Sequence, residues 1–292
     1  MVTFSFILTE ECNWTCKYCA FPSIEKPTYA QMDVMDKHLK YIKDFINKIE
    51  FLSNRQVGIE VQGGELGLIP HVMLGYFLNT LGRKVSISTN GLFLENSYHL
   101  KPSIRPYIKE IMWHLYESPT NIAIPDYIDD ELTITRGIVH DHVQDMVNFI
   151  RRNGHMTFDY VEMEYDIGKY RTTNVGDYRV LWKEMQNLSN VTDSAKNRIK
   201  DRLNEKENLR NMCKDYHSCI SINMVNETIC LCQRAPEINI PLTEENLIKR
   251  ATTFPKDLFR GISKGCNSCT RLYVEKCKRG IENTMILRKH LS

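Results

Sequence analysis

The sequence lacks any hydrophobic run long enough to cross a membrane. A transmembrane helix needs about 20 consecutive apolar residues, and no segment of the 292-residue chain approaches that length. The first ten residues, MVTFSFILTE, have no basic residue ahead of a short apolar run, which fits a buried first strand better than a signal peptide. We therefore expect a cytoplasmic protein with no membrane partner.

An excess of charge of one sign is also absent. The chain has 38 Lys and Arg against 36 Asp and Glu, a net charge of +2. So small a net charge creates no field that would recruit nucleic acid or an acidic surface. Basic residues near the carboxyl end are dispersed among acids, which favours a solvated surface and leaves a nucleic-acid partner open.

Cysteine is missing from the long middle of the chain. The chain has ten cysteines, yet none lies between Cys19 and Cys213. In a reducing compartment, clustered cysteines are metal ligands or catalytic thiols more often than disulfides. Buried structural cysteines would be scattered, so the two clusters indicate at least two metal sites.

Strand-like and helix-like segments alternate up to about residue 205. The patterns predict strands at 3–8, 56–62, 84–90, 110–117, 132–140 and 155–167, helices at 30–52, 69–82 and 141–154, and a polar helical region at 175–210. This alternation predicts an α/β fold with a parallel sheet, either doubly wound or a barrel. Ligands of both arrangements bind where strands end. The residues that follow these strands should therefore gather on one rim.

The first cysteine cluster, ECNWTCKYC, has the spacing C-x3-C-x2-C. A structural zinc site normally uses four Cys or His ligands, and ferredoxin-type clusters use four cysteines. No fourth ligand is near, since His38 lies within a predicted helix. Three thiolates on a cubane leave one iron open to a ligand; a structural zinc knuckle is the alternative.

This loop resembles the signature of the radical S-adenosylmethionine (radical SAM) enzymes, in which an aromatic residue precedes the last cysteine. Here the matching residues are Cys12, Cys16, Tyr18 and Cys19. The resemblance implies a partial (β/α)6 TIM-like barrel over residues 1–205 and a [4Fe-4S] cluster whose open iron binds SAM. Reductive cleavage of SAM would give a 5′-deoxyadenosyl radical that abstracts a hydrogen atom from substrate. An electron donor such as flavodoxin or ferredoxin would be needed.

Shorter motifs after later strands fit the same resemblance. In VQGGELG, glycine permits close backbone approach to a ligand and the glutamate complements the SAM ammonium group. Leu66 stands where relatives usually have proline, and Glu117 where they have aspartate. Each short motif alone is more often a turn signal. The resemblance assigns SAM-binding roles to Tyr18, Gly63, Gly64, Glu65, Ser88, Asn90, Glu117 and Arg136.

The distal cysteines resemble the auxiliary-cluster domains called SPASM and twitch, which implies a small cysteine-rich domain over residues 206–292. The candidate ligands are Cys213, Cys219, Cys230, Cys232, Cys266, Cys269 and Cys277. The spacing departs from the standard SPASM string and favours a shortened, twitch-like domain. The favoured cubane uses Cys219, Cys232, Cys266 and Cys269, with Cys230 as the alternative to Cys232. Cys213 and Cys277 could complete a second auxiliary cluster, and a zinc ribbon is the alternative to both.

The resemblance further implies an oxidation, cross-link or rearrangement on a peptide or a small molecule. Because the sequence begins at the first predicted strand, a peptide substrate would need a separate leader-binding protein. Two alternatives remain: radical SAM modification of a nucleotide or nucleic acid, and a non-catalytic, zinc-bound binding protein. His114, near a predicted strand end, either lines the cavity or is packed in the core.

Overall fold

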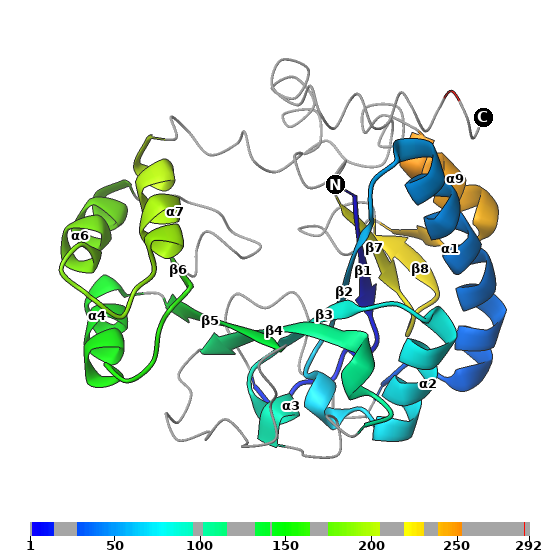
Figure 1. The fold of residues 1–292 in the computed structure, drawn as a ribbon, viewed down its shortest axis with the longest axis horizontal. Helices are drawn as coiled ribbons and strands as arrows, with labels where there is room; N and C mark the ends of the chain where they lie inside the picture. The colour runs from blue at the N-terminus through cyan, green and yellow to red at the C-terminus, as the bar shows by residue number, and fades with distance from the viewer. Residues whose placement is uncertain are drawn as a thin grey trace.

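The computed structural model describes residues 2–14, 28–95, 102–115, 132–140, 142–163, 175–204, 219–230, 239–252 and 289. The described strands form a single sheet of order β6-β5-β4-β3-β2-β1-β7-β8-β9 (Figure 1). The strands are β1 (Thr3–Ile7), β2 (Gly58–Gln62), β3 (Val85–Thr89), β4 (Ile108–Leu115), β5 (Thr133–His140), β6 (Tyr160–Met163), β7 (Cys219–Asn223), β8 (Thr228–Cys230) and β9 (Asn239–Pro241).

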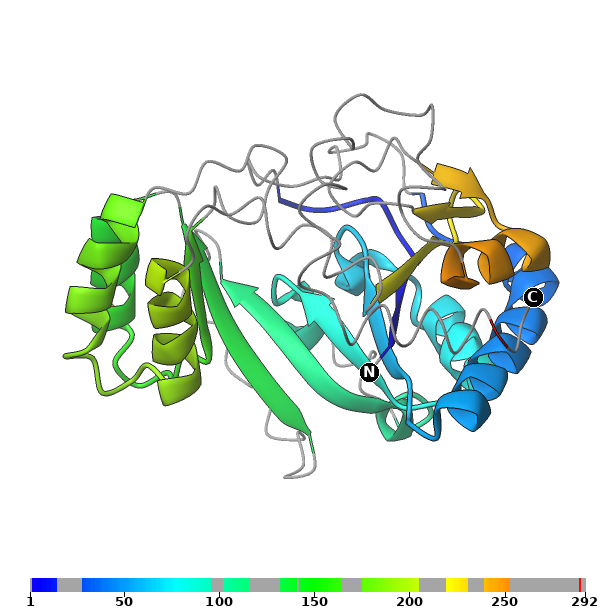
Figure 2. The same cartoon turned by 90° about the horizontal axis from the view of Figure 1, so that it is seen from above.

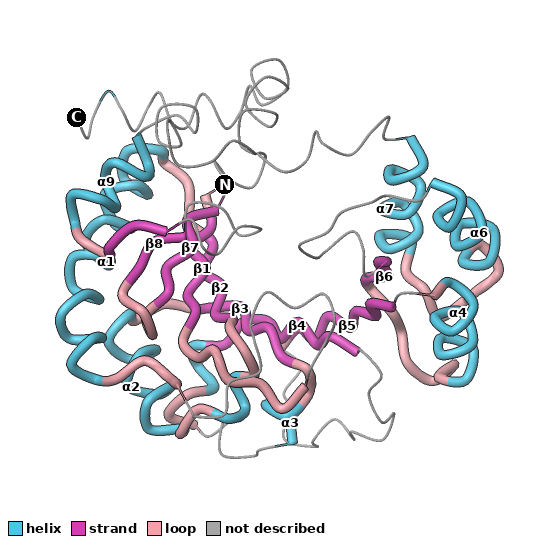
Figure 3. The backbone as a smooth tube through the Cα atoms, turned by 180° about the vertical axis from the view of Figure 1, so that it is seen from behind, coloured by secondary structure: helices cyan, strands magenta, loops and turns pink. Residues whose placement is uncertain are grey.

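The strands β1 to β6 lie side by side in chain order and are all parallel. This order has no reversal of the kind that defines a doubly wound sheet. The sheet curves, with helices on its outer side (Figures 1 and 3). The predicted α/β class and parallel sheet are confirmed, whereas closure into a partial barrel stays a prediction.

Helices α1 (Met32–Ser53) and α2 (His71–Leu81) cover one face of β1 and β2. Alternating residues of β1 supply that face: the Phe4 ring lies 6.1 Å from the Phe45 ring of α1, and the Phe6 ring 5.2 Å from the Phe77 ring of α2. Helix α2 ends at Leu81, followed by Gly82 with φ 64°. Both helices confirm the predicted segments.

The opposite face of the sheet carries a polar row. The register aligns Ser5, Glu60, Ser86 and Glu110 across β1 to β4. The Ser86 and Thr135 hydroxyls each donate to the Glu110 carboxylate over 2.9 Å. Burial, and secondly the charge of Glu110, raise the pKa of Glu60. The face of the sheet opposite α1 and α2 is therefore suited to polar ligands.

The far end of the sheet carries α4 (Val143–Arg152), α6 (Val175–Met185) and α7 (Asp193–Asn204), as Figure 2 shows. The predicted polar helical region at 175–210 is therefore two helices within its described part. The break buries Leu188 and Val191, and Val191 bridges to Phe158. The Thr192 hydroxyl then accepts a bond from the Ala195 amide over 3.3 Å, which caps α7. The last predicted parallel strand corresponds to β6, which begins at Tyr160 and not at residue 155.

The distal strands continue the same sheet. Strand β7 pairs with β1 in parallel from Thr3↔Cys219 to Ile7↔Asn223, and β8 and β9 follow in antiparallel order. Helix α9 (Glu244–Thr252) comes next. The division at 205/206 stays a prediction, but the hairpin beyond it is joined to the first strand. In the part of the chain that is described, no helix is long and apolar enough to cross a bilayer.

Candidate functional site

The chain enters the first cysteine loop through residues 8–11, which are held on two sides. On the β2 side, the amides of Leu8, Gly64 and Glu65 bond to the carbonyls of residues 62, 9 and 11 over 2.7–3.2 Å. On the other side, the Glu10 amide donates to the Thr28 carbonyl over 3.2 Å and the Ala30 amide to the Leu8 carbonyl over 2.9 Å. The loop that contains Cys12 is therefore closed at its base.

Gly63 and Gly64 make this contact possible. A Cβ atom on Gly63, which has φ +153°, would lie 2.2 Å from the Thr9 carbonyl oxygen, and one on Gly64 would lie 1.8 Å from the Glu11 oxygen. No real Cβ atom approaches so closely. The backbone at both glycines therefore lies in close contact with the backbone of Thr9 and Glu11, which leads to Cys12. Their contact with SAM stays a prediction.

The Glu65 side chain is fully buried and ties the ends of β2 and β3 together. Its Oε1 accepts from the Gly67 amide and the Thr89 hydroxyl over 2.7 Å and from the Phe93 amide over 3.2 Å, and its Oε2 from the Asn90 amide over 2.7 Å. Burial raises the pKa of Glu65, against the hydrogen bonds, which lower it. The carboxylate already accepts four hydrogen bonds from the protein, so its observed role is to hold the ends of β2 and β3 together. Its predicted contact with an ammonium group stays untested.

Two hydrogen-bond donors lie near the sulfur of Cys12, which also lies 4.0 Å from the Asn13 Oδ1 atom. The Trp14 amide lies 3.4 Å and the Asn90 Nδ2 atom 3.8 Å from Cys12 Sγ, and Asn90 Nδ2 also donates to Asn13 Oδ1 over 2.8 Å. The Trp113 indole in turn donates to the Asn90 carbonyl over 3.3 Å. N–H donors stabilise a thiolate, and such bonds tune the ligand sulfurs of iron–sulfur clusters. The surroundings of Cys12 therefore fit a metal-bound thiolate.

The structure places the two remaining described SAM-binding candidates on different faces. Ser88 pairs with Met112 and shares the polar face of the sheet. Arg136 pairs with Trp113 on the opposite face, with its Cζ atom 6.0 Å from the Trp113 ring centroid. Among the described residues its Nε atom has no hydrogen-bond partner, and burial lowers the pKa of the Arg136 guanidinium. The SAM-binding roles of Ser88 and Arg136 stay predictions.

Several predicted metal-binding and SAM-binding residues lie outside the described residues. These are Cys16, Tyr18, Cys19, Glu117, Cys213, Cys232, Cys266, Cys269 and Cys277. Cys219 begins β7 and Cys230 ends β8, and Cys230 pairs with Ser221. Within the described ranges, no three His, Cys, Asp or Glu side chains gather as a metal site. The assignments of ligands to clusters remain predictions.

Sequence reasoning missed the carboxylates of the polar face. Glu60 and Glu110 lie in the strand segments GIEVQ and IKEIMWHL, where a glutamate among apolar residues could have marked one polar face. The sequence predicts that His114 either lines the cavity or is packed in the core. Burial lowers the pKa of His114, and its ring lies 6.3 Å from the Tyr160 ring, nearly perpendicular to it.

Comparison with known proteins yields a structural match only. No family model matches the sequence, and no curated protein matches it. The solved structure "Native anSMEcpe with bound AdoMet" aligns with a TM-score of 0.53 at 12% identity, over 95% of this chain and 84% of that chain. The two chains share a fold. At this identity the match concerns the fold alone, and it is the fold of a protein seen with AdoMet, that is S-adenosylmethionine, bound.

Proposed function

We propose that the chain is an enzyme that binds AdoMet together with a [4Fe-4S] cluster held by Cys12, Cys16 and Cys19, and that it cleaves AdoMet reductively. One observation carries the proposal. A C-x3-C-x2-C motif leaves the first strand at the carboxyl end of a parallel sheet, the edge where ligands of such sheets bind, in a fold shared with an AdoMet-bound structure.

The residues present fit these groups. The Cys12 sulfur lies near the Trp14 amide and the Asn90 side chain, and donors of this kind suit a ligated thiolate. Cys12, Cys16 and Cys19 would hold the cluster, which would supply the electron for reductive cleavage of AdoMet. Gly63, Gly64 and Glu65 hold the loop base and the end of β3 in place, while Asn90 orients the Cys12 sulfur.

The substrate belongs on the polar face of the sheet. Ser88, Glu60 and Glu110 lie on that face, where burial and the charge of Glu110 raise the pKa of Glu60. Such groups suit a peptide or a hydrogen-bonding small molecule. The proposal includes a partial (β/α)6 barrel, an electron donor such as flavodoxin or ferredoxin, a cytoplasmic location, and one or two auxiliary clusters on the distal cysteines. A leader-binding protein would join a peptide substrate.

The test is anaerobic reconstitution followed by assay of 5′-deoxyadenosine with AdoMet and a chemical reductant. We expect iron, acid-labile sulfide and 5′-deoxyadenosine from the natural chain. Changing Cys12, Cys16 and Cys19 together to Ala should remove about four irons, those of one cubane, and abolish 5′-deoxyadenosine. Persistent cleavage in this variant would refute the assignment of the loop. Stoichiometric zinc without sulfide in the natural chain would instead support the zinc-bound binding protein.

A further inference from the structure

The turn between β7 and β8 reaches the chain just before Cys12. Asn223 Nδ2 and Asn226 Nδ2 both donate to Glu10 Oε1, over 2.7 Å and 2.6 Å. Glu10 lies two residues before Cys12 and inside the segment that closes the loop base. Two side chains from the distal part of the chain therefore hold one carboxylate at the entrance to the first cysteine loop.

The turn itself sets the direction of these amides. The Asn223 side chain is buried, and its Oδ1 accepts from the amides of Val225 and Asn226 over 2.9 Å and 3.1 Å. The Met224 amide also donates to the Ile7 carbonyl over 2.9 Å, which continues the pairing of β7 with β1. With its oxygen occupied inside the turn, the Asn223 amide nitrogen is directed at Glu10.

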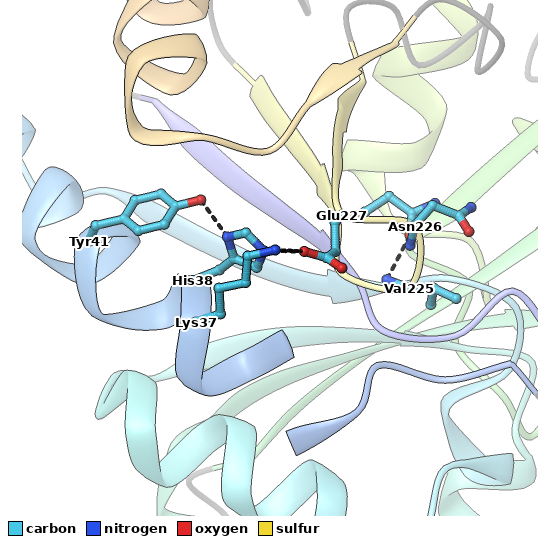
Figure 4. A network of polar contacts seen from close by, with 7 residues as sticks. Lys37, His38, Tyr41, Val225, Asn226 and Glu227 are labelled. Carbon is cyan, nitrogen blue, oxygen red and sulfur yellow. Dashed lines mark hydrogen bonds and ion pairs between the residues drawn. The ribbon is translucent and has the colours of Figure 1, made fainter. Parts of the chain in front are cut away.

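The turn has a second attachment, to helix α1 (Figure 4). Glu227 has φ 50°, and its Oε2 atom lies 2.5 Å from Lys37 Nζ and 2.7 Å from His38 Nε2. The other ring nitrogen of His38 lies 2.6 Å from the Tyr41 hydroxyl. The turn thus has one arm to Glu10 and one arm to α1, and each arm can be cut separately.

We propose that Asn223 and Asn226 are positioning residues for the Cys12 loop, acting through Glu10. A carboxylate that accepts two amide bonds is held more firmly than one in water, and Glu10 transmits this restraint along two peptide units to Cys12. The same β7–β8 hairpin contains Cys219 and Cys230. Its turn contacts Glu10, so the hairpin connects these two cysteines to the segment that leads to Cys12. The inference deepens the proposed function and rests on it for its catalytic meaning.

The experiment measures thiol alkylation in the metal-free, reduced full-length chain, with rates for Cys12 and Cys230 read from their peptides by mass spectrometry. Glu10→Ala and Asn226→Ala should raise the Cys12 rate by about fivefold, since each removes hydrogen bonds that restrain the loop. Glu10→Gln keeps an acceptor oxygen and should restore most of the restraint. Lys37→Ala, which removes one of the two contacts of the α1 arm and leaves that of His38, is the matched control and should leave the Cys12 rate unchanged.

Two outcomes would overturn the inference. One is a Cys12 rate in Glu10→Ala and Asn226→Ala equal to that of the natural chain. The other is a rise shared by the buried Cys230, which would mean that the Glu10 arm holds the fold as a whole. Because the assay uses no cofactor, it is separate from the test of the proposed function. A natural chain that makes no 5′-deoxyadenosine would end the catalytic proposal and leave the alkylation result standing.

Discussion

Gly64 is the position where the β2 loop comes closest to the chain that leads to Cys12. A Cβ atom there would lie 1.8 Å from the Glu11 oxygen, while the next amide, that of Glu65, bonds to the same oxygen over 2.7 Å. The backbone cannot withdraw without breaking that bond. A single methyl group therefore tests whether the two loops must touch.

Gly64→Ala should destabilise the chain by about 1–3 kcal/mol, in the range of overpacking at a close backbone contact, and should lower the iron retained after reconstitution. Gly75→Ala is the control, because a Cβ atom there meets only Ile104 at 3.6 Å inside helix α2. It should be neutral or stabilising by up to about 1 kcal/mol. Urea denaturation of the metal-free proteins measures the free energy of unfolding of each variant. Equal stabilities of the two variants would contradict the steric argument.

At the scale of elements, Glu227 joins the β7–β8 turn to helix α1. Hydrogen bonds from Lys37 and then from His38 lower the pKa of Glu227 below its ordinary value of 4.5. A carboxyl whose pKa is lowered by folding stabilises the folded state above that ordinary value. The contribution is lost as the pH falls through the lowered pKa.

Glu227→Gln should therefore destabilise the metal-free chain at pH 7 by a modest amount, since the pair is partly exposed. The difference from the natural chain should shrink as the pH falls below 4.5 and through the lowered pKa of Glu227, because the natural carboxyl then becomes protonated as well. Urea denaturation at several pH values measures this difference. A difference that stays constant with pH would mean that the charge of Glu227 contributes nothing.

The sequence predicted the local elements well and their partners poorly. Strands β1, β2 and β3 lie within the predicted segments, because alternating apolar residues and turn signals are local features. The pairing of β7 with β1 was not predicted, since nothing in CISIN states which edge it joins. Likewise, the Gly63–Glu65 motif can be found in the sequence, but the four donors around the Glu65 carboxylate come from two segments, after β2 and from the end of β3 onward, that only the fold brings together.

At the scale of the whole molecule, the distal strands β7 to β9 and the strand that leads to the first cysteine loop belong to one sheet. The sequence predicts two separate metal sites, one on each cysteine cluster, and each site should bind its metal independently of the other. Removing one site should therefore leave the other loaded. Whether the two sites are independent can be measured from the iron content and the AdoMet cleavage of the same preparation.

Changing Cys266 and Cys269 together to Ala should lower the iron content by about four atoms per chain, those of one cubane. Cleavage of AdoMet should persist, because the proposed cluster for AdoMet is assigned to Cys12, Cys16 and Cys19, whereas conversion of the substrate should stop. The Cys12, Cys16 and Cys19 triple variant provides the opposite pattern. Unchanged iron content in the Cys266 and Cys269 variant would remove these residues from the ligand set.

The parallel pairing of β1 with β7 also bears on how the protein is made. The first strand leaves the ribosome early, yet one of its two edges gains its neighbour only when Cys219–Asn223 has been synthesised. Until then that edge presents unsatisfied backbone groups to other nascent chains. A chain interrupted before residue 219 should aggregate, and the complete chain should refold slowly, since its central strand waits for a contact more than two hundred residues away.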